Sequence, residues 1–291
     1  MSSPKAAYCL LIAGAALFST GGAAIKATDL SSWQVGSFRS LIAAAALLLM
    51  VPGARRRWNR NLVAVGVAQA ATLLLFVHAN KLTTAANAIL LQSSAPIYIL
   101  LLAPRFLGEK PRRSDLGFMA VLAAGTAAFF IGLDRPFETA PDPASGNLLG
   151  AASGLTWALT LMGLRHLQLT EKDPVGASAA AVVCGNLIAF AVALPLALPV
   201  AVSSAADWAI VLFLGVFQIG VGYVFLTAAL RRVRALEASL FVLLEPVLNV
   251  LLVWWIHGER PAPFAVLGGA LVLGGTTARS WLESRRGVGG G

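Results

Sequence analysis

Long apolar blocks separated by short polar segments run through the whole 291-residue chain. A helix of about 20 apolar residues crosses roughly 30 Å of hydrocarbon, so a window of that length locates candidate spans. Five spans are predicted near 6–25, 33–51, 62–80, 84–103 and 114–133. Five more follow near 147–165, 175–197, 206–229, 235–256 and 262–280. Because nine further blocks follow the first, we interpret the N-terminal one as a span and not as a cleaved signal peptide.

The two groups of five spans are separated by the longest connection, 134–146, which carries three prolines. We therefore predict a first repeat at 1–136, an extracytoplasmic linker at 137–146 and a second repeat at 147–291. The expected fold is an all-α membrane protein with ten transmembrane helices.

Composition supports lipid as the solvent, since 58% of the residues are hydrophobic and only 12% are charged. Soluble domains carry about 25% charged residues. The net charge of +9 would suggest a nucleic-acid partner only if the basic residues shared one face, and here they lie in short loops. Cys9 and Cys184 both sit inside apolar blocks, so no disulfide framework or metal-ligand spacing is present. We expect no nucleic-acid partner, no metal and no cofactor.

Orientation follows from the lysines and arginines, because short cytoplasmic loops hold the excess. Placing the N-terminus in the cytoplasm puts most of the 22 basic residues on that side. Lys26, Arg39 and Lys81 are among the few that fall on or toward the outer side. Both termini are then cytoplasmic, and the predicted location is the plasma (inner) membrane.

An internal repeat relates the two halves. Pro96 and the turn Gly108-Glu109-Lys110-Pro111 recur 150 positions later as Pro246 and Gly258-Glu259-Arg260-Pro261. A second match, at an offset of 149, aligns Gly66, Val67 and Gln69 with Gly215, Val216 and Gln218. Each half has an odd number of spans, so the two copies enter the membrane from opposite sides. This predicts an inverted-topology repeat around a central cavity, which is the architecture of alternating access.

These features resemble the drug/metabolite transporter superfamily, and specifically its EamA branch. The resemblance covers almost the whole chain, and its most specific part is the pair of GEKP and GERP turns in register. Within that branch the chain is most similar to aromatic amino acid exporters of the YddG type. The resemblance implies a secondary transporter that exports small neutral metabolites, amino acids including aromatic ones, by alternating access.

Polar and aromatic side chains at membrane depth are costly unless they face protein or water, so they are candidates for a substrate path. The candidates are Gln69, His78, Gln92, Tyr98, Trp157, Gln218, Tyr223 and Glu245. For the paired glutamines the alternative is helix–helix hydrogen bonding. For Trp157 the alternative is packing against lipid, and for His78 it is a gate or interface position.

Glu245 precedes Pro246 near mid-membrane, where an ionised carboxylate costs roughly 2.5 to 3.5 kcal/mol. It therefore needs a partner or a proton, and either substrate-ammonium binding or proton coupling would supply one. The equivalent residue of the first half is Ala95. Pro96 and Pro246 are expected to shape a kink or a hinge. Gly21 and Gly22 are expected to allow close helix packing.

An enzyme lacks its sequence signature, whereas a channel and an exchanger of another metabolite stay open as alternatives. An enzyme would need a nucleophile–base pair or clustered ligands, and the three histidines lie on different spans or loops. A channel would need rings of charge or filter-like loops. Nucleotide-sugar or phosphate-ester exchangers favour buried basic residues, and Arg39 is the one basic residue near mid-depth. A neutral or zwitterionic solute, such as an amino acid, is the better fit, with the lipid bilayer as the other partner. The oligomeric state stays open, and a monomer is compatible with the sequence.

Overall fold

The computed structural model describes residues 4–108, 140–200, 203–233 and 244–257, with a few single positions near 117–124, 235–238 and 266–274. The long elements of this part are α1 (Pro4–Lys26), α2 (Ser32–Met50), α3 (Arg60–Leu82), α4 (Ala85–Gln92), α5 (Ala95–Phe106), α7 (Pro143–Thr170), α8 (Pro174–Ala197), α9 (Ala205–Phe213), the π-helix η2 (Leu214–Val221), α10 (Gly222–Leu230) and α12 (Leu244–His257).

Seven segments of the described part are long and apolar enough to cross a membrane, with α4–α5 and α9–η2–α10 each forming one of them. They coincide with the predicted spans 1–4 and 6–8. The predicted spans 114–133 and 262–280 lie almost wholly outside the described residues, and so do the two Gly-Glu turns apart from Gly108. The total of ten helices stays a prediction.

Side-chain caps determine where the helices begin. Ser31 accepts from the backbone N–H of Gln34, whose side chain bonds back to Ser31, and this capping box starts α2. Asp142 and Asp173 cap α7 and α8 by accepting from the backbone N–H of Ser145 and Gly176, and each is followed by a proline in the first turn. As a result, α7 begins inside the predicted linker 137–146.

Two of the spans are irregular. The predicted span 84–103 is made of two helices, because α4 ends at Gln92 and α5 begins at Ala95, with Pro96 in its first turn. Proline has no backbone N–H, so it cannot continue the hydrogen-bond ladder of α4. In the span from 205 to 230, α9 passes through eight residues of π-helix before α10. Such π segments often occur at functional sites.

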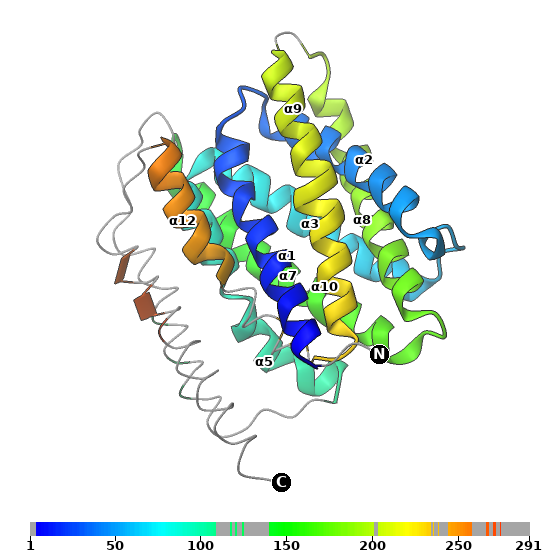
Figure 1. Ribbon diagram of the computed structural model, residues 1–291. Helices are drawn as coiled ribbons and strands as arrows, with labels where there is room; N and C mark the ends of the chain where they lie inside the picture. The colour runs from blue at the N-terminus through cyan, green and yellow to red at the C-terminus, as the bar shows by residue number, and fades with distance from the viewer. Residues whose placement is uncertain are drawn as a thin grey trace.

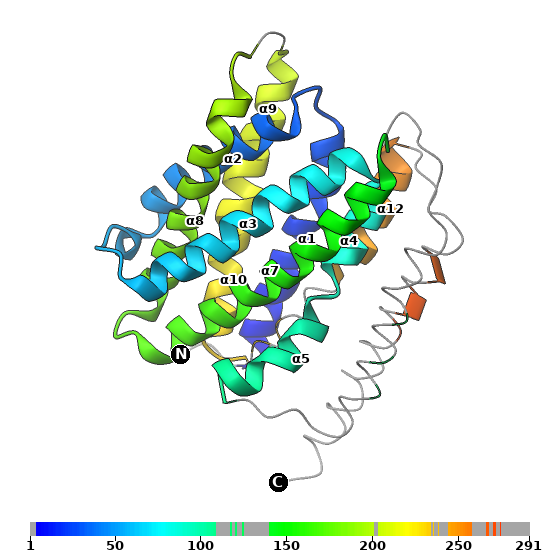
Figure 2. The ribbon, with the colours of Figure 1, turned by 180° about the vertical axis from the view of Figure 1, so that it is seen from behind.

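The helices form one bundle in which the predicted halves interlock (Figures 1 and 2). Helix α3 packs along α7, while η2–α10 packs along α1. Helices α4 and α5 pack against the other side of α7, as α12 packs against α1. Helices α2 and α8 pack against each other. The contacts of the first predicted half with the second therefore recur with the roles exchanged.

The bundle has two chemically different ends. We call the end that holds Lys26 and Lys81 the lysine end, and the end that holds Arg56 and Arg165 the arginine end. Helix α5 finishes at the arginine end, where Leu107 lies near Asn61 at the start of α3.

Helix α12 runs parallel to α1. The Asn249 side chain donates to the Ser19 carbonyl at 2.8 Å, and Leu252 packs beside Ala23 further along the same helix. Helix α12 therefore finishes at the lysine end, opposite to the end at which α5 finishes.

Candidate functional site

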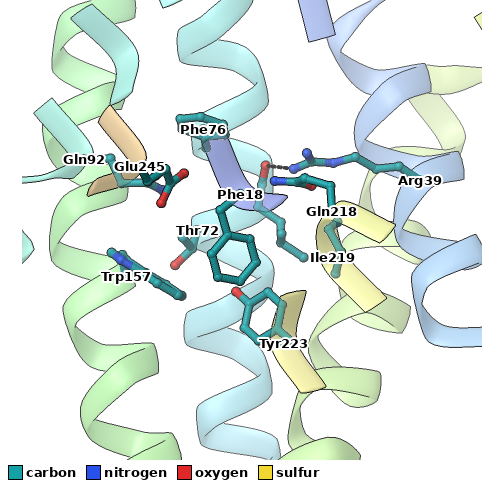
Figure 3. A pocket seen from close by; sticks show the side chains of 11 residues that line it. Phe18, Arg39, Thr72, Phe76, Gln92, Trp157, Gln218, Ile219, Tyr223 and Glu245 are labelled. Atoms are coloured by element: carbon teal, nitrogen blue, oxygen red, sulfur yellow. Dashed lines mark hydrogen bonds between the residues drawn. The ribbon is translucent and has the colours of Figure 1, made fainter. Parts of the chain in front are cut away.

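A small cavity lies where the helices of both predicted halves converge (Figure 3). Its lining comes from α1, α2, α3, α4, α7, η2, α10 and α12, and consists of Phe18, Arg39, Thr72, Leu73, Phe76, Gln92, Trp157, Gln218, Ile219, Tyr223 and Glu245. The free space measures about 40 Å³. A water molecule needs roughly 10–15 Å³ by this measure, so the cavity holds only a few waters in this conformation.

Three aromatic rings form one side of the cavity. Phe18 lies 5.4 Å from Tyr223 and 6.3 Å from Trp157, between ring centroids, and Trp157 lies 6.1 Å from Tyr223. All three pairs meet edge to face, which is a favourable arrangement for aromatic rings. Because the rings come from α1, α7 and α10, this aromatic triad joins the two predicted halves.

Four large polar side chains share the rest of the lining with Thr72 and three apolar residues (Figure 3). Gln92 and Glu245 lie side by side on one flank, and Arg39 and Gln218 lie together on the other. All four are almost fully buried. The Arg39 Nη2 donates to the Leu73 carbonyl at 3.1 Å. The cavity thus carries one basic and one acidic side chain on opposite flanks.

The structure places Arg39, which the sequence assigned toward the outer side and near mid-depth, at the central cavity. Its side chain is 1% exposed and lies at the central cavity. Because α2 begins at Ser32, Arg39 sits about two helical turns inside the helix, within the predicted span 33–51.

Five of the eight predicted substrate contacts lie together in the cavity lining: Gln92, Trp157, Gln218, Tyr223 and Glu245. Gln69 lies outside it, and its buried side chain packs against Gly185 of α8, where its amide has no hydrogen-bond partner among the described residues. The His78 Nδ1 lies 2.8 Å from the Leu74 carbonyl, and its ring meets that of Trp33. Tyr98 packs beside the apolar core. Substrate contact by Gln69, His78 and Tyr98 stays a prediction.

The predicted packing glycines lie where two polar side chains cross α1. A Cβ added at Gly21 would sit 2.8 Å from the Gln218 Nε2, so the missing side chain leaves room for that amide beside the cavity. A Cβ at Gly22 would collide with the amide of Asn249. Pro246, the predicted counterpart of Pro96, is the third residue of α12.

Sequence reasoning missed several lining residues, among them Phe18 and Thr72. Phe18 is one apolar residue in an apolar block, so no local signal separates it from lipid-facing neighbours. Thr72 lies in the same helix as Gln69, and its hydroxyl lies 3.4 Å from that of Thr160 on α7. Its polarity at membrane depth was the available signal.

The two halves that bound this cavity both match one known protein family. The profile of the EamA-like transporter family matches residues 5–131 and residues 144–280. The chain belongs to the EamA-like transporter family. This EamA protein is therefore a multi-pass membrane transporter, and its family and apolar helices fit the plasma membrane. The family points to transport and not to catalysis.

Two individual proteins are similar to this EamA protein. An uncharacterized transporter of Archaeoglobus fulgidus is 26% identical over 228 residues, which are 78% of this chain and 78% of that protein. A protein of known crystal structure superimposes with a TM-score of 0.70 at 21% identity, over 97% of this chain and 99% of the other. At that identity the likeness shows the fold alone.

Proposed function

We propose that this EamA protein is a secondary transporter that exports small neutral or zwitterionic metabolites, amino acids including aromatic ones, by alternating access. The observation that carries the proposal is the central cavity, where an aromatic triad faces buried polar groups of both charges. Ligand sites typically combine mostly apolar walls with a few polar groups that fix orientation. The resemblance to aromatic amino acid exporters supports the same substrate class.

Three observations support an inverted repeat as the basis of transport. The family profile matches two stretches of similar length. The contacts of α1 with η2–α10 and α12 repeat those of α7 with α3 and α4–α5. Helices α5 and α12, which carry the matched prolines, finish at opposite ends of the bundle. Halves related in this way exchange conformations around a fixed site.

The small volume of the cavity fits an occluded or contracted state. A space of about 40 Å³ does not admit an amino acid, so substrate entry requires helices to move apart. Because the lining comes from both halves, rocking of one half against the other would widen the cavity toward one end at a time. Trp157, Tyr223 and Phe18 must then separate or turn as the substrate enters.

Counterflow in proteoliposomes tests this function. Vesicles loaded with unlabelled phenylalanine should accumulate labelled phenylalanine transiently, because a carrier exchanges solute and a pore does not. A panel of amino acids and phosphate esters, with and without a pH gradient, defines the substrate class and the coupling. Accumulation of phosphate esters alone would contradict the proposal, and equal flux with and without internal solute would favour a channel.

Trp157→Ala tests whether the cavity is the transport site. Burial of an aromatic side chain against a ligand contributes about 1.5–3 kcal/mol, so the substitution should weaken apparent affinity for phenylalanine by about tenfold or more. Trp255→Ala is the matched control, since Trp255 is 83% exposed on α12 and away from the lining. Equal losses in the two variants would argue against the cavity as the site.

Cysteine labelling tests the inverted topology. In a background without Cys9 and Cys184, Leu107→Cys and His257→Cys report the ends of α5 and α12. A membrane-impermeant maleimide should label them from opposite sides of sealed vesicles. Labelling of both positions from one side would refute the inverted repeat and the mechanism built on it.

A further inference from the structure

Arg39 is a buried cation whose hydrogen-bonding capacity is mostly unused. Its side chain is 1% exposed, and one of its nitrogens donates to the Leu73 carbonyl. Its Nε and Nη1 have no hydrogen-bond partner among the described residues, and neither has the neighbouring Gln218 Oε1. Arginine stays protonated in proteins and offers five donors in a planar fork. Buried donors without partners require an explanation, and a missing ligand is one.

A carboxylate is the group that matches these donors. Burial of a lone charge away from water is costly, so a buried arginine needs an anion beside it. The guanidinium fork binds planar carboxylates through two parallel hydrogen bonds. In the described part of the chain no carboxylate side chain forms an ion pair with Arg39, whereas Arg56 does pair with Glu171.

The one acidic side chain of the lining, Glu245, lies on the opposite flank (Figure 3). It is 7% exposed. In the view of Figure 3 the Tyr223 hydroxyl lies below both side chains. The cavity therefore presents a basic and an acidic side chain on opposite flanks, with the aromatic triad below them in this view.

We propose that Arg39 and Glu245 are the two poles of a receptor for zwitterionic α-amino acids, in which Arg39 binds the carboxylate and Glu245 binds the ammonium group. This inference rests on the proposed function and names its substrate class and specificity residues. With Glu245 ionised, the two side chains sum to zero charge, as the substrate does, so binding pairs both charges without leaving a net charge in the membrane. The side chain of the substrate then faces Phe18, Trp157 and Tyr223.

Competition against labelled phenylalanine in proteoliposomes tests the proposal. Phenethylamine lacks the carboxylate and 3-phenylpropionate lacks the ammonium, while both keep the ring. Each should compete at least about tenfold more weakly than phenylalanine with the wild-type protein, because each leaves one buried charge unpaired. Arg39→Gln should abolish the discrimination against phenethylamine, and Glu245→Gln should abolish that against 3-phenylpropionate.

Matched controls separate recognition from folding. Arg165→Gln also removes a guanidinium that donates to a backbone carbonyl, that of Leu230, but it lies at the arginine end. Glu171→Gln removes a carboxylate from the surface pair with Arg56. Both controls should keep the wild-type ratios. Arg39→Lys, which keeps the charge, should retain part of the preference for phenylalanine over phenethylamine.

Failure of this inference differs from failure of the proposed function. A wild-type protein that neither binds nor exchanges phenylalanine contradicts the function itself. A wild-type protein that transports phenylalanine but accepts phenethylamine equally well overturns the two-pole receptor, without any need for a variant. Unchanged competition ratios in folded Arg39→Gln protein would overturn the role of Arg39 and leave a purely structural one.

Discussion

The lysine end and the arginine end of the bundle are held together by different chemistry. At the lysine end Asp207, 4% exposed, accepts hydrogen bonds from Thr28, Asp29 and Ser204. Lys81 donates to the Thr28 carbonyl at 2.7 Å. At the arginine end Arg56 forms a surface pair with Glu171, whose side chains are 31% and 16% exposed. Two further bonds lie there, from Arg165 to the Leu230 carbonyl at 2.8 Å and from Gln168 to Ser178 at 2.7 Å.

This difference in hydrogen bonding indicates which end resists opening in this conformation. The buried cluster around Asp207 joins the α1–α2 connection to the start of α9, with α3 linked through Lys81. Low surrounding polarity strengthens such bonds, and solvent weakens exposed ones. We infer that the lysine end, predicted to face outward, is the more firmly closed in this conformation. Four substitutions test this contrast.

Asp207→Ala should have the largest effect, since it removes the acceptor of four hydrogen bonds and the first-turn carboxylate that completes the Ser204 capping box. We expect the largest fall in melting temperature of the purified protein and faster maleimide labelling of Leu30→Cys near the cluster. Asp207→Asn keeps an acceptor oxygen and should lose less. If Asp207→Ala keeps the melting temperature and the labelling rate of the wild-type protein, the two ends do not differ in the way inferred.

Gly146→Ala should have the second largest effect on stability. A Cβ there would lie 2.6 Å from the Thr83 backbone nitrogen, so α7 must shift relative to the α3–α4 turn. Overpacking of this kind costs about 1–3 kcal/mol of unfolding free energy. Gly53→Ala is the counterpart near the arginine end, where the added Cβ would lie 2.9 Å from the Gly176 Cα in a half-buried turn. Thermal unfolding of both variants compares them, and a larger fall in melting temperature for Gly53→Ala than for Gly146→Ala contradicts the ranking.

Lys81→Met should have a smaller effect, because it removes one hydrogen bond to a backbone carbonyl and keeps the apolar stem. A loss of about 1–2 kcal/mol is expected for a charged donor. Lys172→Met, at an exposed position of the arginine end, should leave the unfolding transition unchanged. If the two lysine variants unfold alike, the lysine end does not owe its closure to this bond.

Arg56→Ala should have the smallest effect. Exposed ion pairs contribute about 0.2–1 kcal/mol and are screened by salt, so any loss should shrink as salt is raised. Arg57→Ala is the matched control, at the neighbouring exposed position. A loss in Arg56→Ala that exceeds that of Asp207→Ala and persists in high salt would reverse the comparison.

Much of the fold followed from local signals. The seven described spans agree with the apolar blocks because hydrocarbon length and backbone hydrogen bonding leave few alternatives. Caps such as Ser31 and Asp142 mark helix starts in the sequence. Pro96 predicted a kink, and the break between α4 and α5 lies next to it. The π-helix around Gln218 had no sequence signal that we recognised.

The candidate site was only partly predictable. Depth and polarity singled out Gln92, Trp157 and Glu245, which do meet in one cavity. The same criterion selected Gln69, which packs against α8, because a hydropathy window cannot tell which way a side chain faces around the helix axis.

The sequence by itself determined that this protein lies in a bilayer as bundled helices and that its two halves are related. Those properties depend on residue type and spacing along the chain, which are local quantities. Only the tertiary structure decided that Arg39 and Glu245 lie on opposite flanks of one cavity beside an aromatic triad, and that one end of the bundle holds a buried, hydrogen-bonded carboxylate. Those properties depend on helix rotation and crossing, which arise when helices distant in the sequence pack together.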